Sequence, residues 1–441
     1  MLRKWLALLL SVGLLAAVQL GAMSSPGAAQ NQVTLRMVWQ GEAKELDLYK
    51  NLAAKFEAAN PTIKIKVETV VASSDPEYFQ KVQVIAASGD YPDIIYGHYS
   101  FFPAAVEKGF FMNLDPFLQK AGMSKAGFFP TAIEQFTHKG NLYAMPRETS
   151  AIALYFNKDI LKKAGATDPN SYFGQGNWTW DTYLTVAKKL TKDSSGKTAD
   201  QPGFNSNAIV QWGTIAPVNM PFGLFPVVYS FGGSILDKTN TSCQLDQPPA
   251  VQAITFLQDL VLKHHVAILP AQAAQTNLFA NGKVGMMAGG YWEIVVTGSS
   301  IKTFDWDVAP LPKGKIQSTR VATGAYAIPA KAKHPNEAWE AVRFFSRRDN
   351  TMGLARLGLI IPALKEAAQS PEFLQPGKTP VHRKVFVDAL SYGRLDPRTT
   401  HWAEMVNTIG SEMDLVWTGQ KTPAVAARDA CAKVNALLKS K

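Results

Sequence analysis

The sequence predicts an α/β protein built as two lobes around a cleft, and three observations lead to this prediction. Strand-like and helix-like hydrophobic patterns alternate along most of the chain. The 441 residues exceed what one hydrophobic core usually serves, so at least two folded units are expected. No low-complexity linker separates the patterns. That continuity favours lobes joined by short crossings over domains on a flexible string.

The first 29 residues have the pattern of a signal peptide. Arg3 and Lys4 precede an apolar run from Trp5 to Leu20, and small residues follow as far as Ala29. We therefore expect cleavage near Ala29 and a periplasmic or other extracytoplasmic location. No cysteine follows the apolar run, which argues against a lipoprotein anchor. The alternative is an uncleaved N-terminal anchor, although the apolar run is short for a membrane span.

The mature chain opens with a strand, helix and strand. Residues 33–39 are rich in strand formers, and apolar residues at helical spacing follow until Asn60-Pro61. Ile63, Ile65 and Val67 then alternate with charged residues, as in a half-buried strand. The same reasoning predicts, up to residue 190, helices at 75–87, 104–108, 158–163 and 180–190, a short helix starting at Asp115-Pro116, and strands at 93–96, 142–146 and 151–156.

The second half alternates in the same way before a helical C-terminal region. It predicts helices at 249–264, 277–280 and 336–347, strands at 284–288, 305–311 and 325–329, and mainly helix over 352–440. Mostly parallel sheets bind ligands at the carboxyl ends of their strands. Contact residues are therefore expected in four segments: 40–42, 97–101, 289–293 and 324–326.

Composition and motifs exclude several classes of protein. With 46% apolar and 18% charged residues the chain is an ordinary globular protein. The net charge of +10 is scattered, which is typical of solvated surfaces and not of a nucleic-acid site. No GxSxG, HExxH, GxGxxG or P-loop motif is present, so the sequence predicts no enzyme and no cofactor.

Cys243 and Cys431 are the two cysteines of the chain. In an exported protein they could form one disulfide, and the alternative is two buried free thiols, because sequence spacing alone cannot bring the two residues together. No CxxC or HxxxH spacing accompanies them, so no metal site is predicted.

Several segments resemble the group 1 extracellular solute-binding proteins, whose familiar members bind maltose and other sugars. The resemblance is carried by FEAANP at 56–61, SGDYPDI at 88–94, NLYAMP at 141–146, LYFNKD at 154–159 and FANGKVGMM at 279–287. It implies a type II periplasmic-binding-protein fold, with two α/β lobes joined by a hinge. The implied first lobe comprises 30–146 and 303–349, and the second comprises 147–302 and 350–441. The aromatic and proline-rich stretch 208–226 departs from the family pattern.

The resemblance also implies a function. The protein would capture a mono- or oligosaccharide in the cleft between the lobes, close around it, and deliver it to the membrane permease subunits of an ABC importer. We expect a monomer without catalytic residues and without a nucleic-acid partner.

A sugar offers apolar faces and a rim of hydroxyls, so its site needs an aromatic platform and fixed hydrogen-bonding groups. Trp292 resembles the stacking tryptophan of the family, and Trp402 resembles a second platform. Trp39 ends the first strand, and each of these rings could instead pack in a core. The remaining candidates for the site are Glu42, Asp93, His98, Tyr99, Arg147, Glu148, Tyr229, Gly290, Glu293 and Tyr326.

Other functions stay open on the sequence alone. A protein of the same fold could bind a polyamine, which would require several acidic residues in the cleft. It could instead bind an iron complex or a polyol phosphate, and an anionic solute would require Arg147 to be directed inward. An exported glycan-processing enzyme is the rival from another class.

Overall fold

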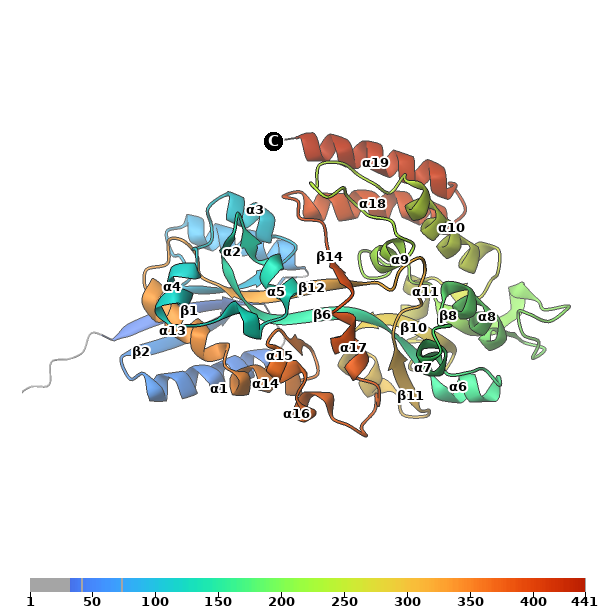
Figure 1. The fold of residues 1–441 in the computed structure, drawn as a ribbon, viewed down its shortest axis with the longest axis horizontal. Helices are drawn as coiled ribbons and strands as arrows, with labels where there is room; N and C mark the ends of the chain where they lie inside the picture. The colour runs from blue at the N-terminus through green and yellow to red at the C-terminus, as the bar shows by residue number, and fades with distance from the viewer. Residues whose placement is uncertain (1–31, 41–42, 73, 441) are drawn as a thin grey trace, which may run out of the picture.

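The structure is a computed structural model that describes residues 32–40, 43–72 and 74–440 (Figure 1). The predicted signal peptide, residues 1–29, and the predicted site residue Glu42 lie outside the described residues. Among those described, no helix combines the length and the apolar composition needed to cross a bilayer.

The chain opens with the predicted strand, helix and strand. The elements up to residue 157 are β1 (Val33–Trp39), α1 (Ala43–Ala59), β2 (Ile63–Thr69), α2 (Asp75–Ala87), β3 (Ile94–His98), α3 (Phe102–Glu107), α4 (Asp115–Lys120), α5 (Pro130–Gln135), β4 (Thr137–His138), β5 (Asn141–Leu142) and β6 (Ala144–Asn157). The middle of the chain contains α6 (Lys158–Lys163), α7 (Pro169–Gly174), α8 (Trp180–Leu190), β7 (Lys192–Asp193), β8 (Ile209–Ile215), α9 (Leu224–Ser230), α10 (Pro248–Leu262), β9 (Ala267–Ile268), α11 (Pro270–Gln275), β10 (Val284–Gly290), α12 (Glu293–Val296), β11 (Trp306–Ala309) and β12 (Thr319–Ala327).

The C-terminal part is mainly helical, as predicted. It contains α13 (Pro335–Phe345), α14 (Arg348–Arg356), β13 (Ile361–Pro362), α15 (Lys365–Ala368), α16 (Pro371–Leu374), α17 (Lys384–Ala389), β14 (Gly393–Leu395), α18 (Trp402–Trp417) and α19 (Pro423–Lys439).

One long strand, β6, connects the two halves of the molecule. The strand order is β2-β1-β3-β12-β6-β10-β8-β7, with β1 parallel to β2 and β3, and β10 parallel to β8. The first part of β6 pairs with β12, and its last part pairs with β10 and β11. In Figure 1, β6 runs across the middle of the molecule, from the side that carries α2, α3, α4 and α5 toward the side that carries α6 and α7. This long strand is therefore shared by both halves.

β6 differs from the prediction of two separate strands. The polar residues 147–150 interrupt the apolar pattern, and from sequence they indicated a break. The structure continues the strand through them, because Thr149 pairs with Thr323 of β12 and Glu148 pairs with Gly324. Arg147 and Thr149 are buried there despite their polarity. A helix predicted at 277–280 is also absent, since α11 ends at Gln275 and Asn277 has a φ of 45°.

The buried side chains form two hydrophobic clusters. The first surrounds β1, β3 and β12, includes α13 to α17, and continues along β6 to Tyr155. The second lies among α8, α9, α10, α18 and α19. In the segment 350–441, which the sequence interpretation assigned to the second lobe, Met352 and Phe386 belong to the first cluster and Trp402 belongs to the second. Figure 1 accordingly shows α18 and α19 beside α10, with α14 to α16 on the other side of β6.

The two cysteines meet in the second cluster. Cys243 and Cys431 form a disulfide with a Cα to Cα distance of 5.1 Å, across a sequence separation of 188 residues. It attaches α19 to the segment that precedes α10. Of the two alternatives that the sequence left open, the structure has the bridge.

Candidate functional site

A hollow of about 320 Å³ lies where the two halves meet, at the crossing strands. Its wall is contributed by α2, the end of β3, the middle of β6 and β12, and the segments before α9, α12 and β13. The residues that line it are Asp75, His98, Tyr99, Glu148, Thr149, Ser150, Phe222, Trp292, Ala322, Thr323, Gly324, Leu359 and Ile360.

Strand register brings three parts of the chain to this place. Gly324 of β12 pairs with His98 on one side and with Glu148 on the other. A β-carbon at position 324 would lie 2.3 Å from Oε1 of Glu148 and 2.7 Å from the hydroxyl of Tyr96. Only glycine leaves room for the hydrogen bond that the Tyr96 hydroxyl donates to Oε1 of Glu148, at 3.0 Å. The glycine thus permits the carboxylate to sit at the crossing.

Asp75 and His98 form a polar pair at the hollow. Nδ1 of His98 lies 3.3 Å from Oδ2 of Asp75 and 2.9 Å from Oγ of Ser100. Burial raises the pKa of the Asp75 carboxyl to about 6. Burial lowers the pKa of His98 well below its usual value, and the nearby guanidiniums of Arg320 and Arg147 lower it further. His98 is therefore neutral at pH 7, while Asp75 is mostly ionised.

Glu148 is held from behind by Arg147. The guanidinium of Arg147 donates to Glu148 and Glu45, and also to the hydroxyl of Tyr49 at 2.8 Å. Burial raises the pKa of the Glu148 carboxyl, and the charge of Arg147 opposes that rise. Arg147 is not among the residues that line the hollow. It positions a carboxylate there without presenting its own charge.

Thr323 has a buried hydroxyl without a partner. The residue is 2% exposed and lines the hollow, and its Oγ1 makes no hydrogen bond to any described residue. A buried polar group without a partner costs free energy, typically about 1–3 kcal/mol. A hydroxyl or amine of a bound solute could satisfy this oxygen.

Trp292 supplies an aromatic surface to the hollow. It is half-buried, its ring centroid lies 5.3 Å from that of Phe222 in an edge-to-face arrangement, and its Nε1 donates to Oε1 of Glu293 at 3.2 Å. A β-carbon on Gly290 would lie 2.1 Å from the indole, so the ring rests on the bare backbone of that glycine. The geometry fixes the indole by one packing contact and one hydrogen bond.

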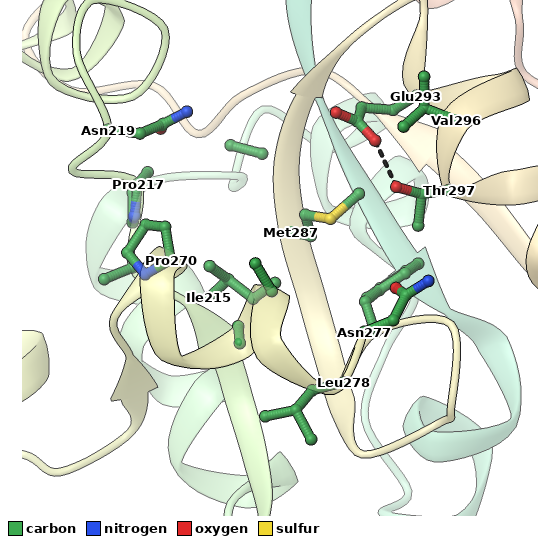
Figure 2. Close-up of a pocket in the computed structure, with 15 residues that line it drawn as sticks. Ile215, Pro217, Asn219, Pro270, Asn277, Leu278, Met287, Glu293, Val296 and Thr297 are labelled. Atoms are coloured by element: carbon green, nitrogen blue, oxygen red, sulfur yellow. Dashed lines mark hydrogen bonds between the residues drawn. The ribbon is translucent and has the colours of Figure 1, made fainter.

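A second hollow of about 370 Å³ adjoins Trp292 on the side of Glu293 (Figure 2). It lies at the carboxyl ends of the parallel strands β8 and β10 and is mainly apolar. In Figure 2, Met287 lies in the middle, with Asn219 and Glu293 at one edge and Asn277 nearer the other. Thr297 donates a hydrogen bond to the second oxygen of Glu293, drawn as a dashed line. The Glu293 carboxylate therefore stands between the two hollows.

The other predicted site residues occupy different surroundings. Trp39 and Tyr326 are 1% exposed and pack with each other, their ring centroids 5.5 Å apart. Both sit near strand ends, but their side chains turn to the core face of the sheet. Asp93 precedes β3, at the amino end of that strand, and its carboxylate accepts from the backbone of Arg36 at 2.9 Å and His334 at 3.2 Å. This places it at the opposite end of β3 from the hollow.

Two further predicted residues lie away from the hollow in the second cluster. Trp402 is 6% exposed, and its ring packs edge-on against Tyr99 at 5.4 Å and against Phe225 at 6.1 Å. Tyr229 lies beneath the guanidinium of Arg394, which is 4.6 Å from its ring centre. Of the thirteen predicted residues, those in the first hollow are His98, Tyr99, Glu148 and Trp292, with Gly290 beneath the indole and Glu293 in the second hollow.

Sequence reasoning missed several residues of the hollow. Asp75 was interpreted as the start of a helix, and Thr149, Ser150 and Thr323 were not singled out. A signal was available in the polar stretch 147–150 between two apolar runs, because polar residues in the middle of a buried strand require a polar surface to face. Within the described part of the chain, no three His, Cys, Asp or Glu side chains gather in a way that could hold a metal ion.

Comparison with known proteins identifies the family. The model of the bacterial extracellular solute-binding proteins matches residues 42–352. The chain belongs to this family. Members are the non-enzymatic solute-binding components of ABC transporters and act outside the cytoplasm, in the extracellular or periplasmic space. The prediction that the chain is a binding protein and not an enzyme is therefore confirmed.

Relatives and solved structures of the family agree in fold. A Brucella abortus protein named only as a binding protein is 25% identical over 445 residues, covering 100% of both chains. The maltotriose-binding protein of Pyrococcus abyssi is 24% identical over 346 residues, which are 76% of this chain and 68% of the relative. An ABC substrate-binding protein of Listeria monocytogenes, solved with cycloalternan, has a TM-score of 0.78 at 25% identity and covers 93% of this chain and 100% of that one. A maltose-bound T. maritima protein has a TM-score of 0.72 at 22% identity, covering 92% of this chain and 100% of that one. The predicted type II periplasmic-binding-protein fold is thus confirmed.

Proposed function

We propose that this solute-binding protein binds a mono- or oligosaccharide in the first hollow and delivers it to the permease of an ABC importer. The observation that carries the proposal is the indole of Trp292 in a hollow whose other walls bear carboxylate, imidazole and hydroxyl groups. This combination suits the apolar faces and the hydroxyl rim of a sugar ring. The names of the Pyrococcus and Listeria relatives, which bind maltotriose and cycloalternan, support the same class of solute.

In this proposal each lining group has a defined role. Trp292 stacks on a sugar face, with Tyr99 and Phe222 forming apolar walls. Asp75 and Glu148 accept hydrogen bonds from sugar hydroxyls, because ionised acceptors bind neutral donors more strongly than neutral acceptors do. His98 and Thr323 complete the polar rim, and Glu293 would meet a second ring that enters the adjoining hollow.

The residues outside the hollows would support it without touching the solute. Arg147 positions Glu148, while Trp39 and Tyr326 fill the core behind Arg147. We place Asp93, Tyr229 and Trp402 in the same supporting class. The predicted contact from Glu42 stays a prediction.

Binding would be coupled to movement of the two lobes. We propose that the first lobe is formed by β1 to β3, α1 to α5 and α13 to α17, and the second by α6 to α12, α18 and α19. A solute that touches both lobes stabilises the closed form through contacts that the open form lacks. Closure of a monomer, exported after loss of residues 1–29, would then be the state that the permease recognises.

The test is a thermal-shift screen of the mature chain against neutral sugars of one to four rings, followed by calorimetry on the hits. A solute at a hundredfold excess over its dissociation constant stabilises the folded state by about 2.7 kcal/mol. We expect a sugar to raise the melting temperature of the wild type and to lose this effect in Trp292→Ala. A screen in which polyol phosphates shift the melting temperature and no sugar does would contradict the proposal.

The structure offers less to an anionic solute. No Lys or Arg is among the described residues that line the first hollow, and Arg147 is turned toward Glu45 and Tyr49 behind it. A polyol phosphate would have to approach Asp75 and Glu148 without a compensating cation. The charge distribution favours a cationic solute over an anionic one.

A further inference from the structure

We infer that the solute is a sugar that carries a protonated amine, with the ammonium group held by Asp75 and Glu148. The inference rests on the proposed sugar-binding function and narrows its substrate class. It comes from the charges of the hollow, its aromatic walls and the partnerless hydroxyl of Thr323.

The charged groups around the hollow do not balance. The carboxylates of Glu45 and Glu148 share the single guanidinium of Arg147. Among the side chains that the structure describes, the imidazole of His98 is the one within ion-pairing distance of Asp75, at 3.3 Å, and that imidazole is neutral at pH 7.

The other buried ion pair near the hollow is neutral. Arg320 donates from Nε to both oxygens of Asp396, at 2.8 and 2.9 Å, so these two charges cancel. Among the described side chains at and behind the hollow, these four carboxylates are matched by two guanidiniums, which leaves two formal negative charges without a cationic partner in a chain whose total charge is +10. Leaving charge unpaired in a partly buried site is costly, and a cationic ligand would remove part of that cost. The side chain of Asp75 is 33% exposed and that of Glu148 is 14% exposed, so solvent screens Asp75 more than Glu148.

The walls of the hollow also suit an ammonium group. Trp292 presents an aromatic ring, which attracts a cation through its negative face, whereas the ring of Tyr99 already lies under the guanidinium of Arg320, at 4.9 Å. Within the described part of the chain the buried Oγ1 of Thr323 has no partner, and it can accept a hydrogen bond from N–H. A neutral sugar would use the same acceptors through hydroxyls, but it would leave both negative charges in place.

The experiment compares sugars that differ in one substituent. Glucose and cellobiose carry a hydroxyl at C2, glucosamine and its β1,4-linked dimer carry an ammonium group there, and N-acetylglucosamine and diacetylchitobiose carry a neutral amide. Maltose and spermidine complete the set. We expect an amine-bearing sugar to bind at least about tenfold more tightly than its hydroxyl and amide counterparts at low salt, since bonds to charged groups add about 1.5–3 kcal/mol. Its advantage should shrink as ionic strength rises.

Asp75→Asn tests the assignment to this carboxylate. The substitution keeps the shape of the side chain and removes the charge. We expect it to abolish most of the preference for the amine. The affinity for a neutral counterpart should fall as well, because a sugar hydroxyl loses an ionised acceptor, but by a smaller factor than the affinity for the amine. Asp200→Asn, in the exposed loop after β7, is the matched control and should leave the preference unchanged. Circular dichroism of each variant establishes that it is folded.

The outcomes separate the inference from the proposed function. A neutral sugar that binds as tightly as its amine would overturn the inference and leave the proposed function standing. A preference that survives Asp75→Asn would also overturn it. Binding of spermidine without any sugar, or binding of no member of the set, would count against both.

Discussion

A β-carbon on Gly290 would lie 2.1 Å from Cζ3 of Trp292, so the indole at the hollow can occupy its place only because residue 290 lacks a side chain. Gly290 ends β10, and its carbonyl accepts the hydroxyl of Tyr155 at 2.7 Å. The strand end is therefore anchored while the ring lies against it. This relationship makes the position of the platform testable without touching the platform itself.

Gly290→Ala should turn the indole of Trp292 out of the hollow and weaken sugar binding. An aromatic contact contributes about 1 kcal/mol, so we expect a loss of about fivefold or more in calorimetric affinity. Gly174→Ala is the control, because a β-carbon on that helical glycine meets nothing within 4 Å. Unchanged affinity in Gly290→Ala would show that the indole does not touch the sugar.

The two tryptophans that the family resemblance implied as platforms should respond differently to removal. Trp292 lines the hollow, whereas Trp402 is 6% exposed between Tyr99 and Phe225. Trp402→Ala should lower the free energy of unfolding by about 3–5 kcal/mol, the usual cost of emptying a large core site. Trp292→Ala should leave urea unfolding nearly unchanged and abolish most sugar binding. If Trp402→Ala abolished sugar binding and Trp292→Ala lowered the free energy of unfolding, Trp402 would be the platform and Trp292 the core residue.

The fold could be predicted from sequence because its signals are local and repeated. The alternation of Ile63, Ile65 and Val67 with charged residues marked β2, and Asn60-Pro61 marked the end of α1. The rule that ligands meet the carboxyl ends of strands led to His98 and Trp292 at the hollow.

The rest of the site depends on properties that one sequence does not carry. Trp39 also lies at a strand end, but tertiary packing decides which face of the sheet its side chain occupies. The side chain of Trp39 is buried in the core. Thr323 could not be singled out, because a missing hydrogen-bond partner is visible only after folding. Asp75 looked like an ordinary first residue of a helix, and its place at the hollow depends on where α2 lies against β3.

Thr323→Val should separate stability from binding. The variant keeps the shape of the side chain and removes a buried hydroxyl that has no partner, so the free protein should unfold at the same or higher urea concentration. Sugar affinity should fall several-fold, because the solute loses an acceptor.

Thr319→Val is the matched control in the same strand. Its hydroxyl donates to the carbonyl of Ile152 at 2.7 Å and accepts from the amide of Ile152 at 3.2 Å. Removing it should lower the free energy of unfolding by about 1–3 kcal/mol and leave sugar affinity unchanged. A Thr323→Val protein that is destabilised as much as Thr319→Val would contradict our account of the hollow.

The carboxyl of Asp75 should give the ligand-free protein a pH dependence that opposes ordinary acid denaturation. Its pKa is raised to about 6, so the folded state holds this proton more tightly than the unfolded state does. The protonated Asp75 carboxyl therefore contributes to the stability of the folded state. This contribution is fully present below about pH 4 and is lost as the pH rises through 6. Asp75→Asn should therefore gain stability relative to the wild type between pH 4 and pH 7.

Urea unfolding of both proteins across this range measures the difference. The other charged groups at the hollow, Glu148, Arg147, Arg320 and Asp396, are shared by the two proteins and largely cancel in the comparison. The pKa of His98 is lowered well below its usual value, which keeps the imidazole neutral above pH 6.5. A constant difference from pH 4 to pH 7 would show that the Asp75 carboxyl titrates normally.

The disulfide between Cys243 and Cys431 should stabilise the second cluster without affecting the site. It closes a loop of 188 residues, for which the chain-entropy account gives about 5 kcal/mol. Both cysteines are buried, at 3% and 2% exposure, and neither lines the hollow at Trp292. Replacing both by alanine should lower the urea midpoint strongly, while calorimetry at low temperature gives the wild-type sugar affinity. A reductant should lower the urea midpoint of the wild type and leave the urea midpoint of the double variant unchanged. If the oxidised wild type and the double variant had equal urea midpoints, the disulfide would not stabilise the fold.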